Sequence, residues 1–174
     1  NNKRTSDGKI RFAFSGAAPI KKELIEAYEN FGITIFQGYG MTETSPVISA
    51  ENYCKKNPGS VGFPLPNVTV KINEPDENGI GEIIVQGDNV FKGYLNDKEK
   101  TDEVLINGWC HTGDIGYIDE NGFIFITGRK KDMIVLDNGK KIFPEEIEFI
   151  IHNLEYVKDV LVYADNSAGD DDLK

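Results

Sequence analysis

The order of elements near the N-terminus limits the folds open to this chain more than any other feature. Residues 10–14 (IRFAF) form a short apolar run typical of a buried strand, and residues 33–36 (ITIF) form a second one. The helix candidate between them, residues 20–31, has one apolar face at helical spacing: Leu24, Ile25, Tyr28 and Phe31. Gly32 follows where a C-terminal cap belongs. A strand, a helix and a strand joined by short turns form a βαβ unit, so we expect the two strands to be parallel.

Further along, the sequence changes to short β runs separated by turns. Between residues 61 and 128 these runs predict a small antiparallel barrel or sandwich, interrupted by one helix candidate at residues 97–105. After the charged joint GRKKD, we expect a hairpin around the turn DNGK and a helix that begins at Pro144. Its expected apolar face is Ile147, Ile150, Ile151 and Leu154. Residues 157–164 are predicted to form a final strand.

These elements predict an architecture of α/β plus β. Residues 1–50 would be the end of a parallel α/β subdomain, and residues 51–130 a small antiparallel β-barrel-like subdomain. Residues 131–174 would be the first part of a small, mobile α+β C-terminal domain. Two parallel strands cannot cover both of their own faces, and a parallel sheet is normally buried on each side. We therefore expect the chain to be part of a larger protein.

The charge balance limits the partners. The chain has 29 Asp and Glu against 19 Lys and Arg, a net charge of −10, which argues against nucleic acid and anionic membrane as main partners. No apolar run approaches the roughly 20 residues of a membrane span, so we expect no transmembrane segment, while peripheral membrane contact and the oligomeric state stay open. The isolated Cys54 and Cys110 are typical of unpaired thiols in a reducing compartment, which predicts a cytoplasmic location.

The stretch QGYGMTE, residues 37–43, combines the groups that a nucleotide requires. Tyr39 offers a ring that can lie on another flat ring, and Thr42 offers a hydroxyl to a phosphate oxygen. Glu43 is a hard oxygen ligand suited to Mg²⁺, which usually takes one or two carboxylates plus phosphate oxygens. The glycines that flank Tyr39 are interpreted as room for a ligand close to the backbone. Ring, phosphate and metal contacts in this order predict a nucleotide site.

Two neighbouring stretches extend this prediction. SGAAP, residues 15–19, is expected at the same sheet edge, either as a place where a flat ring meets the backbone or as a plain strand-to-helix turn. In NGWCHTGDIG, Asp114 could accept two hydrogen bonds from a ribose diol. His111 is interpreted as shaping this loop rather than as a general base.

The charged joint GRKKD contributes a further candidate. Arg129 offers a fork suited to ribose or phosphate oxygens, whereas Lys130 is interpreted as a solvated basic side chain.

Taken in order, these stretches resemble the AMP-forming acyl-CoA synthetases, which belong to the adenylate-forming superfamily with the luciferases and the peptide-synthetase adenylation domains. The resemblance covers nearly the whole chain and rests on SGAAP, QGYGMTE, GSVGFPLP, GEIIVQG, NGWCHTGDIG and GFIFITGRKKDMIVLDNGKKIFPEEIE. MIVLDNGKKIFPEEIE most resembles the long-chain fatty-acid branch. The reaction that this resemblance implies has two halves. A carboxylate attacks the α-phosphate of ATP to give acyl-AMP and pyrophosphate, and the thiol of coenzyme A then displaces AMP.

The resemblance implies a role for each matching position around adenosine. The base is implied to stack on Tyr39 and to contact Gly16, Ala17, Ala18, Gln37 and Gly38. Ala17 stands where many members have glycine. Asp114 is implied to hold the ribose hydroxyls, with help from Ile126 and Arg129.

Three positions are implied to be catalytic. Thr42 would bind the α-phosphate and Glu43 the Mg²⁺. Lys131 matches the hinge about which the small C-terminal domain swings, and the DNGK turn would then help to form the tunnel for coenzyme A. The implied cofactors and substrates are ATP or AMP, Mg²⁺, coenzyme A and a carboxylic acid.

The chain also departs from the family pattern. The Gly-, Ser- and Thr-rich phosphate loop and the lysine near the family's C-terminus are not in the sequence, so we expect the 174-residue chain alone to be inactive. A peptide-synthetase adenylation domain is the alternative within the superfamily. Outside it, the alternatives are a nucleotide-binding module without catalysis and, least favoured, a β-rich interaction domain. The acyl group is left open.

Overall fold

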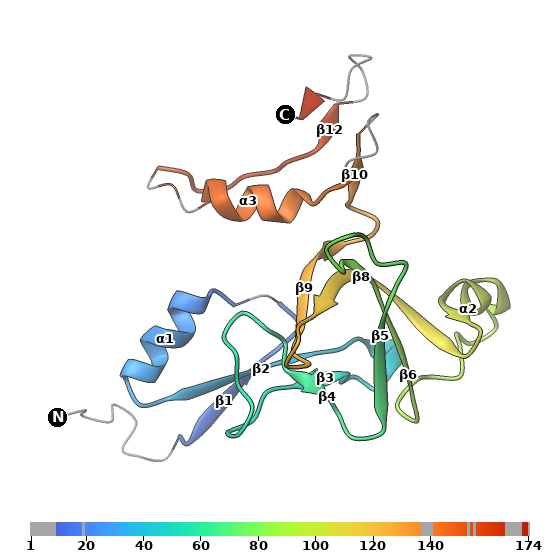
Figure 1. Cartoon of the computed structure of the whole chain (residues 1–174), viewed down its shortest axis with the longest axis horizontal. Coiled ribbons are helices and arrows are strands. Elements are labelled where there is room, and N and C mark those ends of the chain that lie inside the picture. The colour runs from blue at the N-terminus through green and yellow to red at the C-terminus, as the bar shows by residue number, and fades with distance from the viewer. Residues whose placement is uncertain are drawn as a thin grey trace.

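The computed structural model describes residues 10–18, 20–136, 141–152, 154, 156–165 and 172–173. The helices within these ranges are α1 (Lys22–Asn30), the 3-10 helix η1 (Thr42–Thr44), α2 (Lys98–Val104) and α3 (Pro144–His152). The strands are β1 (Phe12–Ser15), β2 (Thr34–Tyr39), β3 (Ser49–Ala50), β4 (Phe63–Pro64), β5 (Val68–Asn73), β6 (Gly81–Gly87), β7 (Leu105–Ile106), β8 (Trp109–Ile118), β9 (Ile124–Arg129), β10 (Ile134–Val135), β11 (Lys141–Ile142), β12 (Ala164–Asp165) and β13 (Asp172–Leu173). Figure 1 shows two main sheets, one of β1–β4 and one of β5–β9, with few helices.

The predicted βαβ unit is present. β1 and β2 are parallel, with Phe12 opposite Thr34, and α1 connects them. The helix ends as predicted, because Gly32 has a φ of 79° and its N–H donates to the Glu29 carbonyl at 2.8 Å.

The burial predicted for this unit is wrong. Phe12 and Phe14 of β1 are exposed, and of the predicted helix face only Ile25 is buried, while Leu24, Tyr28 and Phe31 are exposed. The reason is that β1 is an edge strand, whose only strand neighbour among the described residues is β2. Periodicity identifies the apolar face of an element but not whether anything covers it.

One core joins the first sheet to the second. β2 pairs with β3 and β3 with β4, both antiparallel, so the first sheet is mixed. The fully buried cluster consists of Ile48, from just before β3, with Ile83, Val85 and Ile124 from β6 and β9. Burying each such side chain contributes about 1.5–3 kcal/mol, as an upper bound.

The second sheet is antiparallel, as the short β runs predict. Its strands follow the order β5, β6, β8 and β7, and β9 pairs with the second half of β8. The sheet has two register shifts. Between β6 and β8 the extra residues lie on β8, because Glu82 pairs with Ile115 and Ile84 with His111. Between β8 and β9 the extra residue lies on β9, because Ile115 pairs with Gly128 and Gly116 with Ile126. Bulges of this kind increase twist and redirect side chains, and these two flank Asp114 and its neighbours.

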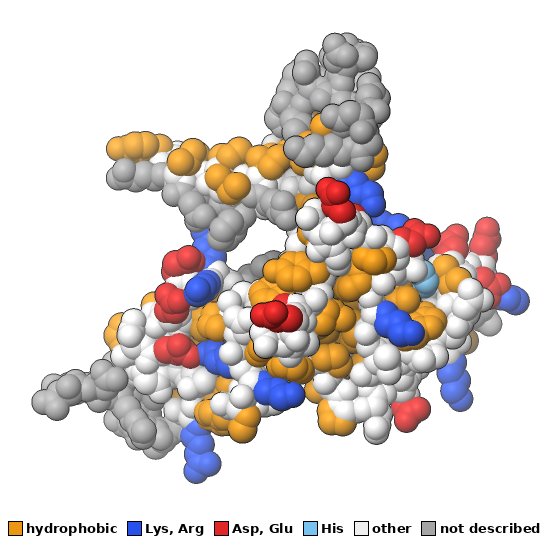
Figure 2. Space-filling view, in the orientation of Figure 1, with side chains coloured by type: hydrophobic (Ala, Val, Ile, Leu, Met, Phe, Trp, Pro, Cys, Tyr) orange, Lys and Arg blue, Asp and Glu red, His pale blue; other side chains and the backbone are white. Residues whose placement is uncertain are grey.

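The C-terminal segment agrees with the sequence prediction only in part. β10 and β11 form the expected antiparallel hairpin, whose DNGK turn lies outside the described residues, and α3 begins at Pro144 as predicted. Ile150 and Leu154 of the expected buried helix face are 68% and 60% exposed. Figure 2 shows hydrophobic side chains gathered along this segment, on the side turned away from the two sheets.

The final strand predicted over residues 157–164 is wrong. Residues 157–163 are not in a strand, and only β12 pairs, with β13. An apolar, β-branched run becomes a strand only where a neighbour offers backbone hydrogen bonds, and the described residues supply that neighbour only at β12.

β9 leads directly into the C-terminal segment (Figure 1), which packs against the end of that strand. A Cβ atom placed on Gly128 would lie 3.2 Å from Cδ1 of Phe143 and 3.0 Å from Oε2 of Glu145. Phe143 is itself buried in this contact.

No helix among the described residues is long and apolar enough to span a membrane.

Candidate functional site

The carboxyl ends of β1 and β2 lie beside each other. A Cβ atom on Gly16, just after β1, would stand 3.4 Å from the carbonyl oxygen of Gly38 in β2. Gly16, Ala17 and Ala18 are exposed, and Ala17 has a φ of 67°. A left-handed conformation costs an L-residue roughly 1–2 kcal/mol, and such strain is concentrated at functional sites. The structure therefore brings together the two stretches predicted to contact one flat ring.

Gly40 has a different role from the predicted one. A Cβ atom there would stand 1.9 Å from the carbonyl oxygen of Pro46 and 2.7 Å from Cα of Val47. The interpretation that this glycine leaves room for a ligand is wrong, because the space is taken by the chain's own backbone as it folds back after η1.

Gln37 is buried, and both its side chain and its backbone N–H are hydrogen-bonded. Its side-chain amide donates to the Ser60 carbonyl at 2.7 Å, and its backbone N–H donates to Oε2 of Glu51 at 2.9 Å. Glu51 is 1% exposed, and burial raises the pKa of its carboxyl. The contacts of Gln37 therefore brace β2 against the following loop.

Tyr39, Asp114 and Arg129 meet at the centre of the site, although they come from three strands, β2, β8 and β9. The Tyr39 hydroxyl donates to Oδ2 of Asp114 at 2.6 Å, and Nε of Arg129 lies 3.0 Å from Oδ1 of the same carboxylate. Burial, and then the negative charge of Asp114, raise the pKa of Tyr39, so its hydroxyl stays a donor. Asp114 is 5% exposed, whereas the Arg129 side chain that covers it is 57% exposed.

Glu43 lies in η1 and is held by a different neighbour. The hydroxyl of Tyr94 donates to its Oε1 at 2.7 Å, and the Phe91 N–H donates to its backbone carbonyl at 2.8 Å. Thr42, the adjacent candidate, is exposed. No hydrogen bond joins Glu43 to Tyr39 or Asp114 among the described residues.

A buried carboxylate, Glu82, supports the loop that carries Asp114. Its Oε2 lies 3.0 Å from Nδ1 of His111 and 2.9 Å from Nζ of Lys130, and its Oε1 accepts from the Gly113 N–H at 3.2 Å. His111 thus contacts the loop framework, in keeping with the loop-shaping role expected for it. Lys130 is not merely solvated, as the sequence suggested, because its ammonium group pairs with this buried carboxylate.

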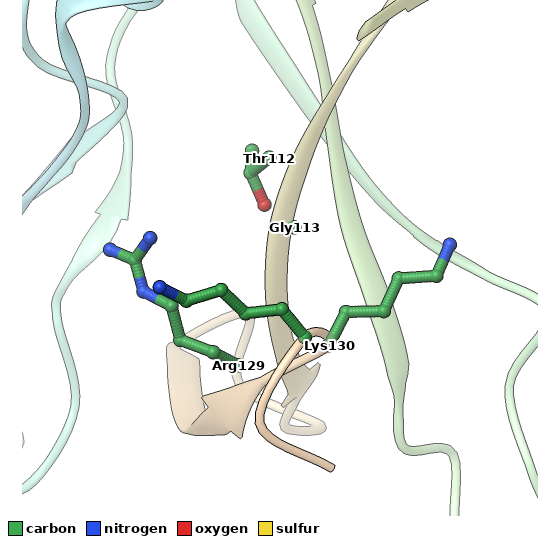
Figure 3. Close-up of a pocket in the computed structure, with 5 residues that line it drawn as sticks. Thr112, Gly113, Arg129 and Lys130 are labelled. Carbon is green, nitrogen blue, oxygen red and sulfur yellow. The ribbon is translucent and has the colours of Figure 1, made fainter. Parts of the chain in front are cut away.

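The joint after β9 borders an open pocket of about 380 Å³. Thr112, Gly113, Arg129 and Lys130 surround it in Figure 3, and Lys131 completes the lining. Lys131 is exposed and lies in a turn closed by a hydrogen bond from the Asp132 N–H to the Arg129 carbonyl. Ile126, in β9, is 38% exposed and lies opposite Gly116.

Glu82 gives the site a pH-dependent stability. Burial alone would raise the pKa of Glu82, but the hydrogen bonds from His111 and Lys130 outweigh it and hold the pKa below its usual value. A lowered folded-state pKa means that the stabilisation is complete above the unfolded pKa and is lost as the pH falls through the folded one. We expect Glu82→Gln to lose about 1–3 kcal/mol of unfolding free energy at pH 7. Its unfolding free energy should also fall less steeply as the pH is lowered.

Urea denaturation between pH 3 and 7 measures this effect. Glu120→Gln, at an exposed turn position, is the matched control and should follow the unsubstituted chain. If the unfolding free energies of Glu82→Gln and the unsubstituted chain fell equally steeply with decreasing pH, the role given to Glu82 would be contradicted.

A sequence model described as AMP-binding enzyme matches residues 1–95, more than half of the chain. The chain belongs to the AMP-binding enzyme family. A long-chain-fatty-acid–CoA ligase of Mycobacterium bovis is 40% identical over 141 residues, which are 81% of this chain and 23% of that protein. A 2-succinylbenzoate–CoA ligase of Oceanobacillus iheyensis is 42% identical over 155 residues, which are 86% of this chain and 32% of that protein. This family member therefore spans less than a third of the length of the curated relatives it matches.

Solved structures give the same family relationship. O-succinylbenzoate coenzyme A synthetase (MenE) from Bacillus subtilis, in complex with AMP, has a TM-score of 0.81 and 34% identity, with 92% of this chain and 34% of that one covered. The same enzyme in complex with ATP and magnesium ion has a TM-score of 0.80 and 34% identity, with 92% of this chain and 35% of that one covered. The resemblance to AMP-forming synthetases predicted from the sequence is thereby confirmed.

The residues present fit a nucleotide with a divalent cation. A carboxylate has about four lone-pair sites, so Asp114 can accept from ribose hydroxyls beside Tyr39 and Arg129. Among the described residues, no donor contacts Oε2 of Glu43, which leaves this hard oxygen free for a cation.

Sequence reasoning on this AMP-binding family member missed three supporting residues. Glu82, Tyr94 and Glu51 each hold a predicted site residue or its neighbour, yet none was a candidate. Glu82 had a signal, because it is the one carboxylate in the otherwise apolar run of β6. Tyr94 and Glu51 had none, since their partners lie 51 and 14 residues away in the chain.

Proposed function

We propose that this chain is part of an AMP-forming acyl-CoA ligase, which activates a carboxylic acid as acyl-AMP and transfers it to coenzyme A. In this proposal residues 1–50 and 51–130 belong to a large adenylating domain and residues 131–174 begin the mobile C-terminal domain. The cysteine usage supports a cytoplasmic location. Both fatty-acid and succinylbenzoate ligases are close relatives, so the long-chain acyl group rests on the resemblance of MIVLDNGKKIFPEEIE alone.

The contacts of Asp114 with Tyr39 and with Arg129 are the observation that carries this proposal. It links three strands around one carboxylate, at the edge where β1 and β2 end. In the proposed complex, Asp114 accepts hydrogen bonds from the ribose hydroxyls while Arg129, whose side chain is largely exposed, shifts to share the carboxylate. The Tyr39 ring lies under the base, and Gly16, Ala17, Ala18, Gln37 and Gly38 border it. Ile126 packs beside the ribose.

Thr42 and Glu43 would serve the phosphate end of the nucleotide. The exposed hydroxyl of Thr42 donates to an α-phosphate oxygen, and Glu43 holds Mg²⁺ through a carboxylate oxygen. The cation supplies neutralisation of the charge on the phosphates. These groups hold and orient the substrates, so catalysis rests on positioning and electrostatic stabilisation.

Exchange of pyrophosphate into ATP by the full-length protein tests the proposal. Fatty acids of rising chain length and 2-succinylbenzoate are compared as acid substrates. Exchange that depends on one acid, followed by thioester formation with coenzyme A, supports the ligase. Tight AMP binding without exchange for any carboxylic acid supports a nucleotide-binding module, and exchange with amino acids alone supports a peptide-synthetase domain.

The hinge proposal makes its own prediction. Lys131→Pro in the full-length protein should leave the adenylation half-reaction within about threefold and slow thioester formation at least about tenfold, because proline fixes φ and blocks a backbone swing. Pyrophosphate exchange and single-turnover thioester formation measure the two halves separately. Lys131→Ala, which removes the side chain without fixing φ, is the control. Equal losses in both halves for Lys131→Pro would rule out the hinge assignment.

A further inference from the structure

The loop after β6, residues 89–94, holds Glu43 from two sides. The Phe91 N–H donates to the Glu43 carbonyl at 2.8 Å, and the Tyr94 hydroxyl donates to Oε1 of its side chain at 2.7 Å. The Asn89 side chain adds hydrogen bonds to the carbonyls of Thr44 and Val47, at 3.0 and 2.9 Å. One loop therefore fixes both the backbone and the carboxylate of the candidate metal ligand.

Tyr94 is itself held in place. Its ring packs edge-on against Phe91, with centroids 4.9 Å apart. Its backbone N–H donates to the Thr101 hydroxyl at 2.9 Å, and that hydroxyl donates to the Asp97 carbonyl at 2.7 Å. Ring and backbone of Tyr94 therefore each have an anchor besides the Glu43 carboxylate.

The Tyr94 hydroxyl contacts only one of the two carboxylate oxygens of Glu43. Oε1 is occupied by the phenol, and no donor from the described residues reaches Oε2. A carboxylate only accepts hydrogen bonds, so the Tyr94 phenol is the donor in this contact. Because Mg²⁺ demands near-octahedral geometry, a ligand carboxylate fixed in one orientation binds it better than a freely rotating one.

We propose that Tyr94 is a positioning residue for the metal site, which occupies Oε1 of Glu43 and leaves Oε2 for a divalent cation. This inference rests on the proposed function, since it deepens the role given there to Glu43. Loss of a group that orients a metal ligand typically costs about 10- to 100-fold in metal affinity or activity. Tyr94→Phe removes the hydroxyl alone and keeps the ring on Phe91.

Binding of Mn²⁺ tests the proposal without requiring turnover. The full-length protein is saturated with AMP, and the loss of the free-ion electron paramagnetic resonance signal is followed as Mn²⁺ is titrated. We expect Tyr94→Phe to raise the dissociation constant about 10- to 100-fold and Glu43→Gln to abolish binding at this site. Tyr53→Phe is the matched control, because Tyr53 is 67% exposed and its hydroxyl has no partner among the described residues.

The two possible failures are distinguishable. If Glu43→Gln loses the ion while Tyr94→Phe binds it as the unsubstituted protein does, the positioning role is wrong and the proposed function stands. If Glu43→Gln also binds normally, the metal role of Glu43 in the proposed function fails. Binding of AMP in the presence of EDTA serves as a second measurement, and a loss there in Tyr94→Phe would mean that Tyr94 supports the fold instead.

Discussion

Replacement of Glu43 by alanine is expected to lower the rate of adenylation by the full-length protein at least about 100-fold. A bound cation stabilises developing negative charge by several kcal/mol, and each 1.36 kcal/mol is a factor of ten in rate. The substitution removes the only carboxylate of η1 and leaves the Tyr94 hydroxyl without its acceptor. Pyrophosphate exchange measured across Mg²⁺ concentrations reports the effect.

Glu120→Ala, at an exposed turn after β8, controls for loss of a surface carboxylate. Normal exchange by Glu43→Ala at limiting Mg²⁺ would contradict the metal role. Loss of exchange together with a lowered melting temperature would point to a structural role for the contact between Glu43 and the 89–94 loop.

Replacement of Asp114 by asparagine is expected to weaken AMP binding about 10- to 100-fold. Hydrogen bonds to a charged acceptor are worth about 1.5–3 kcal/mol, and the variant removes the charge while keeping the size of the side chain. Arg129 also loses its ion-pair partner, and Tyr39 loses an anionic acceptor. Calorimetric titration with AMP measures the loss.

A matched control sharpens this prediction. Asp159→Asn, at an exposed position in the C-terminal segment, is the control and should bind AMP normally. Unchanged AMP affinity in Asp114→Asn would remove Asp114 from the nucleotide site.

The elements that the sequence predicts well are those set by local chemistry. The Gly32 cap and the Pro144 start of α3 depend on residues within a few positions of one another, and the βαβ unit and the β10–β11 pairing join elements that are consecutive in the chain. The wrong predictions concern what lies across from an element. The exposure of Phe14 and the absence of a strand over residues 157–163 depend on neighbours that local periodicity does not encode.

The same distinction between local chemistry and contacts across elements applies to the site. Tyr39 and Asp114 were predicted to serve one ligand, and they touch although they are 75 residues apart. Their contact with each other, the pairing of Lys130 with Glu82 and the hydrogen bond from Tyr94 to Glu43 each join segments far apart in the chain. These contacts could not be predicted because the donor and the acceptor of each lie in different elements.

Gly128 sets how the two ends of the joint after β9 fit together. Phe143 and Glu145 approach the place where a side chain would begin, so the C-terminal segment packs closely on β9 at a position without a Cβ atom. An added methyl group would require the Phe143 and Glu145 side chains to shift by a few tenths of an ångström. The contact surface between β9 and the proposed swinging domain therefore begins three residues before the proposed hinge at Lys131.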